Sequence, residues 1–154
     1  MLRWLFASKV RAGALLYPVA WMGVVFVMSS LPGGLTMDES WLGALPDWLL
    51  PANTDLLHTP GYAVLALLWC RGLRVWPMTA ARGAFLAFVI AFGFGLLMEW
   101  QQAAIPGRMA SATDLALNAA GALAAVGLYL LGARRVERNA RSFQSRCDSG
   151  PDDT

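Results

Sequence analysis

The sequence predicts an all-α membrane protein with four transmembrane helices and both termini in the cytoplasm. Three observations support this fold class: the composition, the lengths of the apolar runs and the distribution of basic residues. Hydrophobic residues make up 57% of the 154 residues and charged residues only 14%, whereas soluble domains carry about 25% charged residues. A chain of this length and composition is expected to be one polytopic membrane domain and not a soluble globule.

The apolar runs divide the chain into a transmembrane domain over residues 1–132 and a polar tail over 133–154. The four expected spans cover residues 12–31, 56–76, 83–102 and 113–132. The first has no charged residue and is long enough to cross about 30 Å of hydrocarbon. A signal peptide has a shorter apolar region of about 7–15 residues. The tail is basic up to Arg146 and lacks apolar periodicity, so we expect it to be disordered.

Local signals refine these spans. Thr59 is a candidate N-cap for the second span, with Pro60 in its first turn, where a missing N–H is tolerated. Gly93 and Gly95 in the third span allow another helix to approach closely. Ser111 or Thr113 is expected to cap the fourth span, since Ser111-x-x-Asp114 resembles a capping box. The acidic segment between the first two spans contains Trp41 and Trp48, which favour a short helix at the membrane interface.

Basic residues predict the orientation, because Lys and Arg collect on cytoplasmic segments. Eleven of the twelve lie in the N-terminal segment, in the last turns of the second span and the loop after it, or in the tail. The exception is Arg108, in the loop between the third and fourth spans. The first and third loops are therefore expected outside the cytoplasm. Cys70 and Cys147 fall on the reducing side, so no disulfide is expected.

Polar residues gather where the two outer loops meet spans two to four. Residues three or four apart share one helix face, and an ionisable group in hydrocarbon costs about 2.5–3.5 kcal/mol by insertion scales. Such groups are best explained by contacts with each other or with a ligand. The set comprises Asp55, His58 and Tyr62 around the start of the second span, Glu99 and Gln102 at the end of the third, Arg108 in the loop, and Ser111, Asp114, Asn118 and Gly121 around the start of the fourth.

These residues, in this order and spacing, resemble the VanZ-like family of small bacterial membrane proteins. The resemblance rests on His58…Gly61-Tyr62, Glu99-x-x-Gln102 and Pro106-Gly107-Arg108…Ser111-x-x-Asp114-x-x-x-Asn118-x-x-Gly121, and Ser29-Ser30-Leu31-Pro32 is similar to the family's pattern after its first span. The family usually has a lysine and an aromatic residue where this chain has Leu56 and Thr59. The resemblance implies a multi-pass protein of the bacterial inner membrane. A link to glycopeptide resistance would be an analogy only.

Several roles remain open for these side chains. His58, Glu99 and Asp114 are the candidate catalytic residues, with His58 or Glu99 as the acid or base. The alternative is that His58 is a structural residue bonded to Asp55 or Glu99. Arg108 suits a phosphate, or it forms an internal ion pair with Glu99 or Asp114. The candidate binding residues are Asp55, Tyr62, Gln102, Arg108, Ser111 and Asn118, although helix packing is the simpler interpretation for Asn118 and Gly121.

We therefore expect a protein that binds or acts on an envelope lipid or a lipid-linked cell-wall or glycan precursor. Whether it is an enzyme stays open. The alternative is a non-enzymatic accessory or scaffold module of an envelope complex, in which the polar residues form an internal ion-pair lock; a small transporter subunit is a third option. The expected partners are membrane lipids, a phosphate-bearing lipid and other envelope proteins. No cofactor is expected, and no metal, since His58, Glu99 and Asp114 lack tight ligand spacing. The arginines of the tail favour contact with anionic lipid over nucleic acid.

Overall fold

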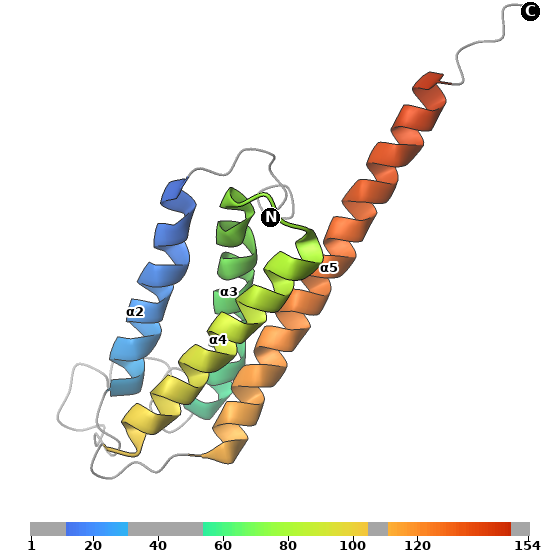
Figure 1. Cartoon of the computed structure of the whole chain (residues 1–154). Coiled ribbons are helices and arrows are strands. Elements are labelled where there is room, and N and C mark those ends of the chain that lie inside the picture. Colours follow the sequence, from blue (N-terminus) through green and yellow to red (C-terminus); the bar gives the residue numbers. More distant parts are fainter. Residues whose placement is uncertain (1–11, 31–53, 105–110, 149–154) are drawn as a thin grey trace, which may run out of the picture.

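The computed structural model describes residues 12–30, 54–104 and 111–148 (Figure 1). This part of the chain is helical throughout, apart from short turns, and contains no β-strand, so the all-α prediction is confirmed. The elements in chain order are η1 (Ala12–Leu15), α2 (Leu16–Ser30), α3 (Thr54–Gly72), η5 (Leu73–Val75), α4 (Ala80–Gln102) and α5 (Ala112–Asp148).

The four α-helices lie side by side in a bundle with α3 at its centre (Figure 1). The most extensive contact is between α3 and α5, followed by α4 with α5 and α3 with α4, while α2 packs on α3 and α4. Small side chains fill the core between them, including Ala66, Ala87 and Ala91, which are fully buried. Small core residues let helices pack closely where lipid supplies no hydrophobic driving force.

The bundle has two ends. At the end that we call the α4–α5 end, α2 and α4 finish and α3 and α5 begin; at the α3–α4 end, α3 finishes and α4 begins (Figure 1). The start of α4 is capped by Thr79, whose hydroxyl accepts a hydrogen bond from the Arg82 amide at 3.3 Å. This is an ordinary N-cap.

Among the described residues, three stretches are long and apolar enough to cross a membrane: Gly13–Ser30, Ala80–Gln102 and Ala112–Ser145. Their outward faces carry exposed large apolar side chains such as Leu16, Phe85 and Leu128, a surface that hydrocarbon would cover. The α3 helix is not among the three, because polar residues at both of its ends lower its hydropathy. A count of four spans therefore remains a prediction.

Two details of the helices differ from expectation. The α3 helix begins at Thr54, so Pro60 lies inside it and Thr59 is not its N-cap. Proline lacks an N–H and cannot donate to the carbonyl four residues earlier, yet the helix continues on both sides of it. Gly93 is exposed, and a Cβ added there would have no neighbouring atom within 4 Å, whereas Gly95 lies in the helix interface.

The tail also differs from expectation. The prediction of disorder over 133–154 is wrong up to Asp148, because α5 continues as one helix of 37 residues, about 55 Å long at 1.5 Å per residue. It projects beyond the rest of the bundle (Figure 1). No glycine or proline occurs between Ala133 and Ser149, and alanine and arginine are good helix formers. The expected interfacial helix around Trp41 and Trp48 lies outside the described residues.

Candidate functional site

Four polar side chains are buried together at the α4–α5 end of the bundle. They are Tyr62 from α3, Glu99 and Gln102 from α4, and Asn118 from α5, each less than 8% exposed. We call these four residues the polar cluster. All four were predicted as site residues, and three helices bring them to one end of the molecule.

Gly95 is the reason that two of these side chains meet. A Cβ at this position would lie 3.4 Å from Cε1 of Tyr62 and 3.6 Å from Nδ2 of Asn118, so both side chains pack on its backbone. Glu99 follows one helical turn later and lies within electrostatic range of the Tyr62 hydroxyl. The Tyr62 ring also contacts Phe94, with ring centroids 6.3 Å apart. Tyr62 is therefore held between an apolar ring and polar neighbours.

Most polar atoms of the cluster have no hydrogen-bond partner in the described part of the chain. These atoms are the Tyr62 hydroxyl, Glu99 Oε1, Gln102 Nε2, and both Nδ2 and Oδ1 of Asn118. A buried donor or acceptor that lacks a partner costs about 1–3 kcal/mol, and such groups are uncommon in native proteins. The cluster thus offers donors and an anionic acceptor for a polar group that the described part of the chain does not supply.

The second oxygen of Glu99 has a structural partner. Glu99 Oε2 accepts a hydrogen bond from the Ser111 amide at 2.9 Å, and Ser111 Oγ accepts one from the Asp114 amide at 3.3 Å. Ser111 is therefore the N-cap of α5. The sequence prediction leaves Ser111 and Thr113 open as caps, and Ser111 is the correct one. In a capping box the acid three residues later would bond the Ser111 amide; here Glu99 of α4 does so, and the end of α4 is joined to the start of α5.

Hydrogen bonds to α2 were not predicted. Gln101 Nε2 donates to Ser30 Oγ at 2.6 Å, and that hydroxyl donates to the Phe26 carbonyl at 2.7 Å. Trp21 Nε1 donates to the Gly61 carbonyl at 2.9 Å. The sequence does show polar residues at the ends of two apolar runs, Ser30 and Gln101. That pattern does not by itself identify them as hydrogen-bond partners.

Gly121 confirms the helix-packing interpretation. A Cβ here would lie 3.0 Å from the carbonyl carbon of Thr59 and 3.2 Å from its Cα, and closer still to its carbonyl oxygen. The backbones of α3 and α5 are therefore in direct contact one turn after Asn118. Glycine permits this approach because it has no side chain.

The remaining predicted residues are only partly placed. The backbones of Asp55 and His58 belong to the first turns of α3, but their side chains lie outside the described part, as does the whole of Arg108. Asp114 lies partly exposed in the first turn of α5. The ion pair of Arg108 with Glu99 or Asp114 thus remains a prediction. The described residues contain no group of three His, Cys, Asp or Glu side chains that would hold a metal ion.

The apolar outer faces of this all-helical bundle are those of a membrane protein. Its polar cluster is buried at one end of the bundle. The model of the VanZ/LLP1 family matches residues 14–133, and the chain therefore belongs to this family. The match includes the whole polar cluster and ends at Ala133, before the projecting part of α5. No curated protein and no solved structure matches the chain.

Proposed function

We propose that this protein crosses the bacterial inner membrane four times and binds the polar part of an envelope lipid, or of a lipid-linked glycan precursor, at its polar cluster. The observation that carries the proposal is the set of buried polar atoms in Tyr62, Glu99, Gln102 and Asn118 that have no partner among the described residues. The amides of Gln102 and Asn118 would donate to phosphate or sugar oxygens, and Glu99 Oε1 would accept from a hydroxyl. Arg108 would neutralise a phosphate, because guanidinium matches that anion in geometry and charge.

The distribution of charge supports an extracytoplasmic position for the cluster. Every arginine among the described residues lies at the α3–α4 end or on the projecting part of α5. The polar cluster lies at the opposite end. Since basic residues stay on the cytoplasmic side, the cluster would face the outside, where lipid-linked wall precursors are used.

A reporter fusion tests this orientation. An enzyme that is active only outside the cytoplasm is expected to work when fused near residue 45 or 106 and to fail near residue 78 or after residue 135. Measured expression of each fusion is the control for absent activity. Reporter activity at residue 78 would reverse the orientation and place the cluster in the cytoplasm.

The replacement Asn118→Leu tests ligand binding at the cluster. Leucine has a similar size and removes two polar atoms that lack a partner among the described residues. The protein without ligand is therefore expected to melt at a higher temperature, by the equivalent of about 1–3 kcal/mol. The same variant should lose the lipid that copurifies with the wild-type protein in native mass spectrometry. The matched control is Asn139→Leu, at an exposed position of α5, which should change neither result.

The accessory-module hypothesis predicts the opposite outcome. Glu99 already bonds the Ser111 amide, so part of the cluster has a structural role and this alternative has direct support. If Asn118 belonged to an internal lock completed by residues outside the described part, Asn118→Leu would lower the melting temperature and leave lipid copurification unchanged. That result would contradict the proposed binding function.

A further inference from the structure

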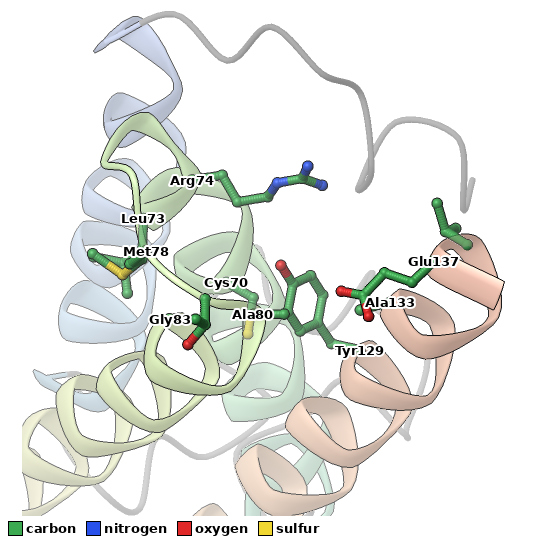
Figure 2. Close-up of a pocket in the computed structure, with 11 residues that line it drawn as sticks. Cys70, Leu73, Arg74, Met78, Ala80, Gly83, Tyr129, Ala133 and Glu137 are labelled. Carbon is green, nitrogen blue, oxygen red and sulfur yellow. The ribbon is translucent and has the colours of Figure 1, made fainter. Parts of the chain in front are cut away.

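A hollow opens at the α3–α4 end of the bundle, opposite to the polar cluster (Figure 2). Its volume is about 330 Å³, within the range of about 300–1,000 Å³ that is typical of small-molecule sites. Residues from α3, η5, α4 and α5 line it, so it lies where four elements meet. None of its lining residues belongs to the polar cluster.

The hollow has an apolar floor and a charged rim. Cys70, Leu73 and Ala133 are buried at the floor. Figure 2 shows the guanidinium of Arg74 and the carboxylate of Glu137 reaching toward the same space from η5 and α5, with the hydroxyl of Tyr129 between them. A cation and an anion thus face one cavity from different elements.

The membrane level of this rim follows from the length of α5. Asp114 and Arg134 are the charged residues that bound the apolar part of this helix. They are 20 positions apart, which corresponds to a rise of about 30 Å, the thickness of the hydrocarbon layer. Glu137 lies about one turn beyond Arg134. The rim would then stand at headgroup level, with the floor next to the acyl chains.

We propose that this hollow binds a phospholipid headgroup that carries both a phosphate and an ammonium group, as phosphoethanolamine does. Arg74 would contact the phosphate and Glu137 the ammonium, while the apolar floor would contact the glycerol and the first carbons of the chains. Charge-assisted hydrogen bonds of this kind are the strong ones. The site is separate from the polar cluster, and the proposal does not rest on the function proposed for that cluster.

The test is a native mass spectrometry titration of the full-length protein in detergent. The probes are phosphatidylethanolamine and phosphatidylglycerol with identical acyl chains, because only the first carries an ammonium group. Soluble O-phosphoethanolamine is added as a competitor in a separate series. The variants are Arg74→Gln and Glu137→Gln, and the matched control is Arg82→Gln, an exposed arginine in the first turn of α4 that does not line the hollow.

Wild-type protein is expected to prefer phosphatidylethanolamine by about five- to tenfold, a typical gain for one such contact. Arg74→Gln should weaken both lipids, whereas Glu137→Gln should weaken phosphatidylethanolamine alone and abolish the preference. Arg82→Gln should bind both lipids as the wild type does. Excess O-phosphoethanolamine should displace phosphatidylethanolamine from the wild-type protein, because the proposed polar contacts are all made by the headgroup.

Three outcomes would overturn the proposal: equal binding of the two lipids by the wild-type protein, a preference that persists in Glu137→Gln, or no displacement by excess O-phosphoethanolamine. Because Glu137 is exposed, its replacement is not expected to affect folding, and the test stays decisive even if Arg74→Gln does not yield folded protein.

Discussion

Gly121→Ala is expected to destabilise the protein strongly, by about 1–3 kcal/mol or more. The new methyl group would overlap the main chain of Thr59, and backbone atoms cannot rotate away as a flexible side chain can. The α3 and α5 helices would have to separate at the most extensive contact in the bundle. A lower melting temperature and a loss of monodisperse protein in detergent would report this.

Gly127→Ala is the matched control on the same helix. A Cβ at Gly127 meets nothing within 4 Å, and alanine is favoured over glycine in a helix by about 1 kcal/mol. Gly127→Ala should therefore melt at the same temperature as the wild type or slightly higher. If the two variants melted alike, the close approach of α3 and α5 at Thr59 would be wrong.

The contact at Gly121 also concerns the polar cluster. Asn118 precedes Gly121 by one helical turn and packs with Tyr62 on Gly95. A separation of α3 from α5 would move Asn118 away from Tyr62, even though Gly121 itself touches no ligand. Residual folded Gly121→Ala protein is therefore expected to bind less copurifying lipid than Gly127→Ala does.

Much of this architecture follows from simple sequence patterns. Long runs without charge identify the helices, because the bilayer requires about 20 apolar residues for each crossing. Glu99, Gln102 and Asn118 are conspicuous because polar residues are costly in apolar helices. Their burial near one another follows from the alternating direction of successive helices, which brings the end of α4 and the starts of α3 and α5 to one end.

What the sequence does not reveal is which groups become partners. Glu99 was expected to pair with Arg108 or to act on a ligand, but one of its oxygens bonds the Ser111 amide, a backbone group with no sequence signature. The bond from Gln101 to Ser30 likewise depends on how α2 packs against α4. Such pairings are set by helix rotation and separation, which hydropathy does not encode.

The projecting part of α5 illustrates a different difficulty. Its charge and lack of apolar periodicity are typical of disorder, whereas its residues individually favour helix. The second tendency prevails because a formed helix already precedes it, so no new nucleus is needed. The extension in turn brings Glu137 next to the hollow that Arg74 borders, a juxtaposition that a disordered tail would not have suggested.

Two replacements of Glu99 separate its structural role from its proposed role in binding. Glu99→Gln keeps an acceptor oxygen for the Ser111 amide, so the melting temperature is expected to stay within about 1 kcal/mol of the wild type. The charge is lost, however, and a hydrogen bond to a charged group is worth about 1.5–3 kcal/mol. The copurifying lipid in native mass spectrometry should therefore decrease by about tenfold or more.

Glu99→Ala is expected to lower both the melting temperature and the amount of copurifying lipid. It leaves the Ser111 amide without its partner and opens a cavity at the start of α5, which together cost about 2–4 kcal/mol. Gln144→Ala, an exposed position of the same α5 helix, controls for the loss of a long polar side chain and should behave as wild type. If Glu99→Gln retained full lipid binding, the charge of Glu99 would have no part in recognition, and the cluster would act through its neutral amides and the Tyr62 hydroxyl alone.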